Sequence, residues 1–349
     1  MRKVSLQDKL LSMLYNVNPN VERKRARPGA ITLEAIAKHV ALKTACSTQA
    51  KHFDECDDDV VSVLDTNRAS DDAELLSTTG EVAHVVMSGG SHTRLNKSLL
   101  DVLPNAGVSL ASHTNMQSHP NIETWVMVSP TTFKAWTSYL SVLVPTPYCT
   151  VFEQFESYAL DPMFNLVSNG VGLRPSGTGD VFSALVESGL LSDNPKAKHI
   201  MISYGNNIIP APDMCMLQRH LATGSLVTCE VTKACPADKT VSPDAPFLAW
   251  HGGGLALLAH EHMPNDGVSR WRATGTMIVD RSVLLSQQAQ QLDAYELVRK
   301  NVKKNIVFQL ERNAWELVNT FPTSFVSGQC HHVWSPETWD DADFMLRNK

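Results

Sequence analysis

The chain has 349 residues, 43% of them hydrophobic, and a formal net charge of −6. The length suggests about two domains or one large α/β domain with additions, and the acidic balance argues against a nucleic-acid or polybasic membrane surface as the main partner. The seven cysteines are odd in number and include no C-x-x-C, a pattern that favours reduced thiols over a disulfide framework or a zinc site.

The first 80 residues predict a helical N-terminal extension followed by an acidic loop. Residues 4–15 and 31–46 carry apolar side chains at helical spacing, and the short basic run at 22–27 is typical of a solvated linker. The N-terminus has no apolar core of a signal peptide, and no stretch approaches the ~18 apolar residues that span a bilayer. We therefore expect a cytoplasmic protein with neither a membrane nor a nucleic acid as its partner.

From residue 81 to 349 the pattern predicts one α/β domain in which strands and helices alternate. The expected strands are 83–87, 124–128, 199–204, 226–231, 247–250 and 306–310. The expected helices are 131–142, 181–190, 214–222, 282–300 and 312–320. Such alternation implies a doubly wound, mostly parallel sheet.

A glycine loop at residues 176–179, Ser-Gly-Thr-Gly, precedes one predicted helix. Because glycine lacks a Cβ, this loop can bring backbone N–H groups close to a ligand. Asp180 is the predicted N-cap of the helix, and Gly189 lies where the helix should end. The next strand leads into residues 205–213, and ligands of open α/β sheets bind outside the carboxyl ends of such strands.

A second glycine loop runs from Ser88 to Lys97, directly after a predicted strand. Its Gly-Gly pair can hold phosphates through backbone N–H groups, with Arg94 or Lys97 supplying positive charge. The loop matches neither G-x-x-x-x-G-K-[ST] nor G-x-G-x-x-G, so an ordinary strand-to-helix turn stays open as an alternative.

Several segments together resemble the eukaryotic-type UDP-sugar pyrophosphorylases. Residues 177–191 are similar to the family's G-H-G-D-[VI]-[FY]-x-A-L-x-x-S-G-x-L segment, which is the most specific match. Residues 203–213 fall in register with S-N-x-D-N-L-G-A-x-x-D, and residues 88–95 resemble A-G-G-x-G-T-R-L. Phe152-Glu-Gln154 resembles F-N-Q, and Gln309-Leu-Glu311 resembles Q-L-E.

The resemblance implies a nucleotide-diphospho-sugar transferase fold, GT-A and Rossmann-like, without a C-terminal β-helix. It further implies an enzyme that transfers a uridylyl group from UTP to a hexose-1-phosphate with the help of Mg²⁺, giving a UDP-sugar and pyrophosphate. In such a reaction the protein positions its substrates and neutralises charge. The Gly-Thr-Gly-Asp sequence at 177–180 resembles the glucose-type branch.

The same resemblance assigns roles by position. The catalytic residues, which neutralise phosphate charge and support the pyrophosphate loop, are Lys97 and Arg94. The nucleotide-binding residues are Gly89, Gly90, Gln154, Gly177, Thr178, Gly179 and Asp180. The metal position falls on Asn206, where the family has an aspartate.

The chain departs from the family pattern at positions that the resemblance assigns to the reaction. His92 replaces a glycine of the phosphate loop, and Asn206 offers Mg²⁺ an amide oxygen without charge. Ala259 stands where the family has a glutamate, and Thr338 where it has a lysine. Three functions therefore stay open. The chain is an active uridylyltransferase, a catalytically impaired nucleotide-sugar-binding or regulatory relative, or a structural partner of an active homologue.

Overall fold

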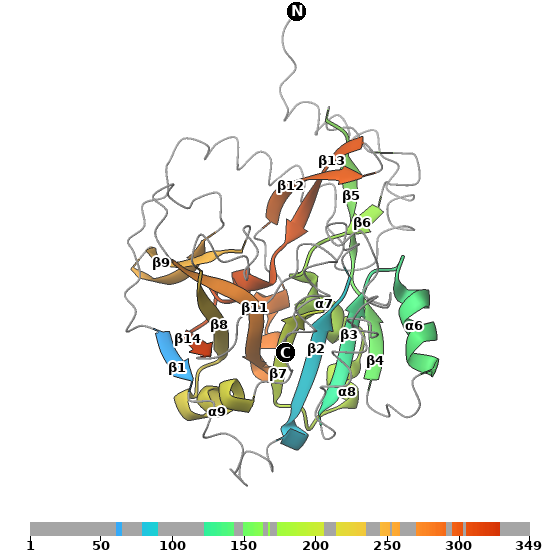
Figure 1. Cartoon of the computed structure of the whole chain (residues 1–349). Helices are drawn as coiled ribbons and strands as arrows, with labels where there is room; N and C mark the ends of the chain where they lie inside the picture. The colour runs from blue at the N-terminus through green and yellow to red at the C-terminus, as the bar shows by residue number, and fades with distance from the viewer. Residues whose placement is uncertain are drawn as a thin grey trace, which may run out of the picture.

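The computed structural model describes residues 61–64, 79–89, 122–142, 149–162, 167, 173–205, 214–234, 245–251, 253–258, 270–290, 295–302 and 305–328. Within them, a ten-stranded sheet forms the body of the molecule and a four-stranded sheet stands above it (Figure 1). The helices expected at 4–15 and 31–46 lie outside the described residues. Residues 61–64, expected in the loop-rich extension, form a strand of the large sheet.

The large sheet is mixed and mostly parallel. Its strands are β1 Val61–Leu64, β2 Val82–Met87, β3 Glu123–Val128, β4 Cys149–Glu153, β7 His199–Tyr204, β8 Val227–Ala234, β9 Phe247–His251, β10 Gly254–Leu258, β11 Arg270–Asp280 and β14 Thr323–Gly328. They follow the order β1-β14-β8-β11-β7-β2-β3-β4, and the β9-β10 hairpin attaches to β11. Strand β11 runs antiparallel to both β7 and β8, whereas β7, β2, β3 and β4 are parallel to one another.

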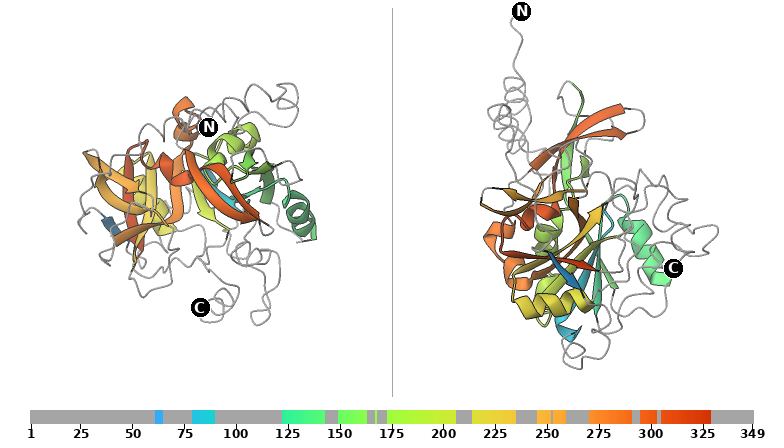
Figure 2. Two further views of the ribbon diagram at one scale, coloured as in Figure 1. Left: turned by 90° about the horizontal axis from the view of Figure 1, so that it is seen from above. Right: turned by 60° about the vertical axis from the view of Figure 1, so that its left-hand side comes forward.

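The small sheet is antiparallel throughout, in the order β12-β13-β5-β6. Its strands are β5 Glu156–Leu160, β6 Leu173–Pro175, β12 Tyr295–Val302 and β13 Asn305–Arg312. It projects from the end of the large sheet at which β2 and β3 finish (Figures 1 and 2). Only two residues, Gln154 and Phe155, separate β4 of the large sheet from β5 of the small one.

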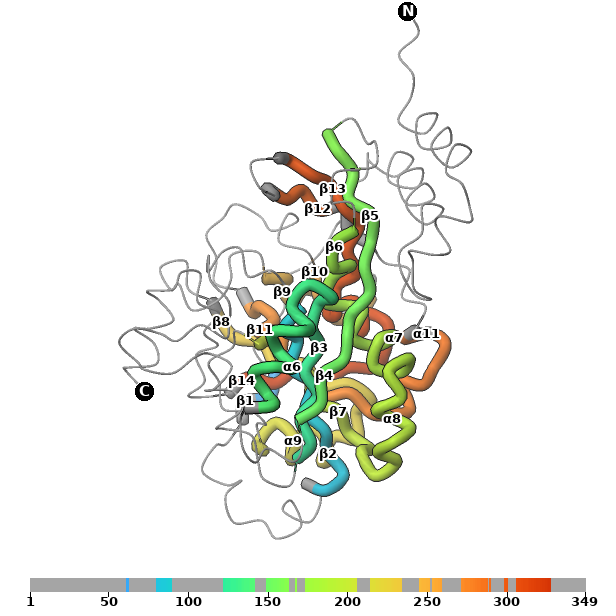
Figure 3. Tube along the Cα trace, turned by 90° about the vertical axis from the view of Figure 1, so that its right-hand side faces the viewer, coloured from blue at the N-terminus to red at the C-terminus, as the bar shows by residue number. Residues whose placement is uncertain are grey.

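Helices cover both faces of the large sheet. They are α6 Phe133–Val142, α7 Asp180–Glu187, α8 Leu190–Asp193, α9 Met214–Thr223, α10 Arg281–Leu284 and α11 Gln287–Gln290, with the 3-10 turns η2 Thr79–Glu81 and η4 Ala314–Leu317. Figure 3 shows α9 on one side of the sheet and α7 and α8 on the other. No helix in the described part of the chain is long and apolar enough to cross a membrane.

The apolar run of β7 follows from this two-sided burial. Ile200 and Ile202 join the core on the side of α7, whereas Met201 points to the opposite face and packs with Met216 and Leu217 of α9. Successive side chains of a strand point to opposite faces, so a strand covered on both sides is apolar at nearly every position.

All six expected strands are confirmed, as β2, β3, β7, β8, β9 and β13. The helices expected at 131–142, 181–190 and 214–222 are confirmed as α6, α7 and α9, with small shifts at their ends. Gly189, at φ +82°, separates α7 from α8 as expected of a helix-ending glycine.

Two expected helices are wrong. In place of one helix over 282–300, the short α10 and α11 are followed by β12, whose pairing with β13 overrides the local helical spacing. In place of a helix over 312–320, Arg312 ends β13 and only Ala314–Leu317 forms a 3-10 turn. The eleven-residue strand β11 is absent from the sequence prediction because the polar run Thr274-Gly-Thr276 interrupts its apolar pattern at a β-bulge.

Two leucines one turn apart on α9 test the position of that helix. Leu217 is fully buried and Leu221 is 38% exposed. We expect Leu217→Ala to lower the free energy of unfolding by about 2–5 kcal/mol, because it leaves a cavity in the core. Leu221→Ala, the matched control, should change it by about 0.5 kcal/mol or less. Urea unfolding followed by circular dichroism measures both, and equal losses would contradict the placement of α9.

Candidate functional site

Backbone hydrogen bonds hold the carboxyl ends of the parallel strands in a fixed arrangement. The N–H of Gly205, just after β7, donates to Met87 O of β2 at 2.9 Å. The N–H of Gln154, just after β4, donates to Val128 O of β3 at 2.8 Å. The chain segments that leave β2, β4 and β7 therefore start at one edge of the sheet, where β3 lies between β2 and β4. This carboxyl edge is where an open α/β sheet binds its ligands.

At this edge the side chain of Gln154 lies directly against Gly89. A Cβ on Gly89 would sit 1.9 Å from Gln154 Oε1, so any side chain at position 89 would displace the amide. Gln154 is only 3% exposed, and within the described part of the chain its amide has no hydrogen-bond partner. A nearly buried amide without a partner retains a donor and an acceptor for a ligand.

The glycine loop 176–179 packs against the end of β13. A Cβ on Gly177 would lie 2.3 Å from Arg312 O, and Gly177 has φ +101°, which favours glycine. The N–H of Gly179 donates to Arg312 O at 2.9 Å, and the N–H of Arg312 donates to Ser176 O at 2.8 Å. The glycines thus permit close contact with β13, and the N–H of Gly179 is engaged there.

Thr178 joins this loop to the end of β7. Its Oγ1 accepts a hydrogen bond from the N–H of Ala314 at 3.1 Å, and its side chain is hydrogen-bonded to Tyr204. The ring of Tyr204 fills the space beside Gly275 in the bulge of β11, where a Cβ would lie 1.9 Å from the ring. Burial raises the pKa of Tyr204 above its ordinary value.

Asp180 is fully buried and its carboxylate faces inward. The prediction that Asp180 is an N-cap is wrong: Gly179 occupies that position, without a side-chain cap, and Asp180 is the first residue of α7. Its carboxylate accepts a hydrogen bond from the Ser176 hydroxyl and pairs with Arg312 Nη1 at 3.5 Å. Burial raises the pKa of Asp180 to about 6, against the lowering effects of Arg312 and Ser176.

The predicted site residues within the described chain all lie along the carboxyl edge and its junction with β13. They are Gly89, Gln154, Gly177, Thr178, Gly179 and Asp180. The remaining predicted residues lie outside the described residues: Gly90, Arg94, Lys97 and Asn206. The departures His92, Ala259 and Thr338 lie outside them too.

The metal position predicted from the sequence, Asn206, is among the residues that are not described. The carboxylate of Asp180 is engaged with Ser176 and Arg312, an arrangement that does not fit a ligand of a hard cation. Asn206 therefore stays the predicted metal position.

Sequence reasoning missed two residues that hold the edge together, Tyr204 and Arg312. Arg312 was expected at the start of the helix predicted over 312–320. Its only signal in the sequence is its position directly after Gln309-Leu-Glu311.

The fold is similar to those of solved UDP-sugar pyrophosphorylases. Against a UDP-glucose phosphorylase from Trypanosoma brucei the TM-score is 0.73 at 17% identity, over 97% of this chain and 78% of that one. Against the uridine diphosphate N-acetylglucosamine pyrophosphorylase from the same organism, in complex with an inhibitor, it is 0.72 at 13% identity, over 98% and 82%.

A variant of the UDP-glucose pyrophosphorylase from Leishmania major in complex with UDP-glucose gives a TM-score of 0.68 at 16% identity, over 97% of this chain and 78% of that one. No family model matches the chain, and no curated protein matches it in sequence. These similarities confirm, at the level of fold, the resemblance that the sequence motifs indicated.

Gly179→Ala tests the close contact between the glycine loop and β13. The added Cβ would lie 2.7 Å from Arg312 Cβ, and we expect a loss of about 1–3 kcal/mol in the free energy of unfolding. Gly254→Ala is the matched control, because a Cβ there meets nothing within 4 Å. Urea unfolding of both variants measures the difference, and a Gly179→Ala variant as stable as the control would contradict the contact.

The raised pKa of Asp180 predicts a pH dependence of stability. Because its folded pKa, about 6, lies above its ordinary value of 3.8, the folded state binds more protons between these values and loses stability as pH rises. We expect the unfolding free energy of the wild type minus that of Asp180→Asn to fall by roughly 2 kcal/mol from pH 4 to pH 7. Asp193→Asn, on the exposed surface of α8, controls for the loss of a carboxylate. A difference that is flat or rises with pH contradicts the prediction.

Proposed function

We propose that the chain is a nucleotidyltransferase of the UDP-sugar pyrophosphorylase type, which binds a uridine nucleotide at the carboxyl edge of the large sheet. The observation that carries the proposal is the side chain of Gln154, held against Gly89 at that edge with its amide unpartnered among the described residues. The fold and the order of the matching motifs support the same conclusion.

The chemistry of an amide suits uracil. The base presents an N–H donor between two carbonyl acceptors, and a primary amide offers one acceptor and two donors. Gln154 can accept from the uracil N–H and donate to a neighbouring carbonyl. Cytosine lacks that ring N–H, so the same amide discriminates between the two pyrimidines. A glycine at position 89 leaves room for the amide.

The proposed reaction is an in-line displacement. An oxygen of the phosphate of a hexose-1-phosphate attacks the α-phosphorus of UTP and forms a new P–O bond, while the bond from the α-phosphorus to pyrophosphate breaks. Gly90, Arg94 and Lys97 follow Gly89 in the chain and are proposed to contact the phosphates, with Arg94 and Lys97 neutralising charge. Mg²⁺ is the proposed cofactor and would neutralise further charge on the triphosphate, with Asn206 offering an amide oxygen.

The glucose-type substrate is proposed from the Gly-Thr-Gly-Asp sequence of the loop at 177–180. The loop residues are proposed to have a positioning role. Gly177 and Gly179 contact Arg312, and Thr178 contacts Tyr204. These contacts fix the loop beside Tyr204, the last residue of β7. Asn206, the proposed metal position, follows Tyr204 by two residues in the chain. Direct contact of Gly177, Thr178, Gly179 or Asp180 with nucleotide is part of the same proposal.

A second candidate function is nucleotide-sugar binding without transfer. It is favoured by the neutral Asn206 at the proposed metal position and by the engagement of the Gly179 N–H with Arg312 O, which withholds a donor from the ligand. Both functions require the nucleotide to bind at Gln154, and they differ in turnover.

Calorimetric titration with UTP and UDP-glucose, with and without Mg²⁺, tests binding. We expect Gln154→Ala to weaken UTP binding by roughly 10-fold, the effect of one or two hydrogen bonds in a water-poor site. Gln287→Ala, an exposed glutamine on α11, is the matched control and should bind as the wild type does. Absence of binding at millimolar ligand overturns both candidate functions.

Pyrophosphate release from UTP and glucose-1-phosphate then separates the two functions. For the transferase we expect Lys97→Ala to lower kcat/KM by about 100-fold or more with little change in the free energy of unfolding. Wild-type binding without any pyrophosphate release assigns the chain to the binding protein instead.

A further inference from the structure

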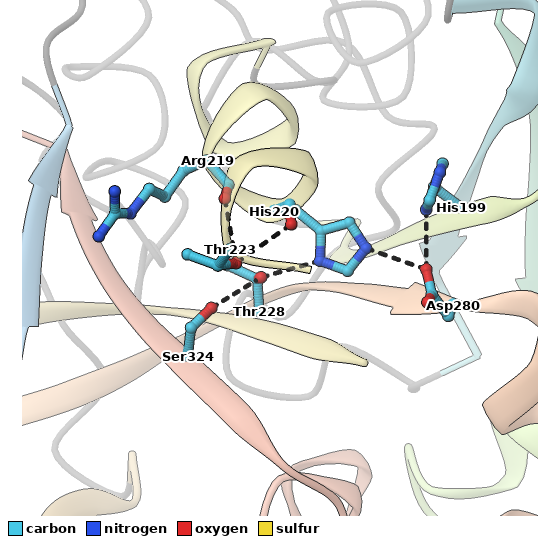
Figure 4. A network of polar contacts seen from close by, with 7 residues as sticks. All are labelled: His199, Arg219, His220, Thr223, Thr228, Asp280 and Ser324. Atoms are coloured by element: carbon cyan, nitrogen blue, oxygen red, sulfur yellow. Dashed lines mark hydrogen bonds and ion pairs between the residues drawn. The ribbon is translucent and has the colours of Figure 1, made fainter. Parts of the chain in front are cut away.

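At the amino edge of the large sheet, opposite the proposed nucleotide site, three side chains converge. Asp280 ends β11 and His199 begins β7, and the two residues are partners in the antiparallel register. His220 reaches them from α9 (Figure 4). His199 Nδ1 lies 2.8 Å and His220 Nε2 lies 3.1 Å from the same oxygen, Asp280 Oδ1. Six residues of β7 separate this cluster from the carboxyl edge, a span of about 17 Å.

We propose that His199, His220 and Asp280 form a binding site for a divalent cation of borderline softness, and that Zn²⁺ is the ion it binds best. Their ligand atoms all lie within 4.8 Å of one another. In a tetrahedral site with bonds near 2.0–2.1 Å, ligand atoms lie about 3.3 Å apart. The two distances to Asp280 Oδ1 thus need to lengthen by about half an ångström or less.

The donor set selects the metal. Two imidazole nitrogens and one carboxylate oxygen match zinc and its neighbours in the first transition row, whereas Mg²⁺ and Ca²⁺ favour sites made of oxygen alone. The site is therefore different in kind from the magnesium position proposed for the reaction. The side chains of His199 and Asp280 are 16% and 28% exposed, so a water molecule can reach the ion and complete four-coordination.

A second layer of hydrogen bonds orients His220 as metal-binding histidines are oriented. His220 Nδ1 is 2.9 Å from Thr228 Oγ1, and Thr228 Oγ1 is 2.9 Å from Ser324 Oγ. The chain of hydroxyls, drawn in Figure 4, leaves Nε2 of His220 directed at Asp280. A metal-binding histidine characteristically makes such a hydrogen bond through its other ring nitrogen, which fixes the tautomer and the plane of the ring.

The three ligands come from three elements that neighbour one another in the fold but not in sequence. An ion here would tie α9 to the ends of β7 and β11, on the side of the sheet remote from the reaction. Its expected effect is on stability, because an ion that binds the folded state alone stabilises it by mass action. A purely hydrogen-bonded anchor for α9 is the competing use of the same side chains.

The experiment is metal titration of the full chain after removal of metal with EDTA. Zn²⁺ affinity is measured by competition with a chromophoric chelator, and Co²⁺ serves as a spectroscopic probe. Because the chain has 13 histidines and seven cysteines, stoichiometry alone is not diagnostic and the variants decide. We expect His199→Ala and His220→Ala each to weaken Zn²⁺ binding by roughly 100-fold or more, and His251→Ala, a histidine on β9, to leave it unchanged.

Two further measurements separate a metal site from a hydrogen-bonded anchor. Thr228→Val, which keeps the three ligands but removes the second-layer hydrogen bond, should weaken Zn²⁺ binding by roughly 10- to 100-fold. Bound Co²⁺ should show the visible absorption of a tetrahedral nitrogen and oxygen site without thiolate charge-transfer bands.

If His220→Ala fails to fold, His199→Ala carries the test, because His199 lies at the partly exposed end of its strand. Zn²⁺ binding that survives His199→Ala, or thiolate bands from Co²⁺, would place the ion elsewhere in the chain and overturn the proposal. A wild type that binds no Zn²⁺ at micromolar concentration overturns it in favour of the hydrogen-bonded anchor.

Discussion

The contact between the glycine loop and the end of β13 is the constraint on which the two-sheet arrangement depends. The N–H of Gly179 donates to Arg312 O, and the N–H of Arg312 donates to Ser176 O, so the backbones pair as two strands would. This exchange requires an approach that a Cβ on Gly177 or Gly179 would block. Because α7 begins at Asp180 and packs on the large sheet, the contact fixes the small sheet relative to the large one.

The buried pair of Asp180 and Arg312 favours one register of this contact between β13 and the glycine loop. A carboxylate without a counter-charge is costly in a buried position, and Arg312 and Ser176 supply most of the compensation. The raised pKa of Asp180 indicates that compensation is incomplete at neutral pH. The loop is thus held by polar groups whose burial costs free energy, and this favours one register between β13 and the loop over neighbouring ones.

The sequence predicted the elements whose local residue pattern determines their secondary structure. Continuous apolar runs identified β2, β3 and β7, since both faces of these strands are buried. The prediction was wrong where pairing with another strand determines the secondary structure. The sequence of β12 has apolar residues at helical spacing, but its backbone pairs with β13. The junction at Arg312 and the cluster at His199, His220 and Asp280 were out of reach, because each joins residues far apart in the chain that only the register of the sheets brings together.

The junction also changes what the glycine motif can be taken to mean. Gly177 and Gly179 are required by packing against Arg312 whether or not the loop contacts a nucleotide, so the motif that most resembles the pyrophosphorylases is evidence of fold before it is evidence of reaction. Evidence for nucleotide binding, which both proposed functions require, has to come from groups that packing does not require. Gln154 is the candidate for such a group, because its side chain is 3% exposed and its amide has no hydrogen-bond partner among the described residues. A bound base would supply the partners that the amide lacks there.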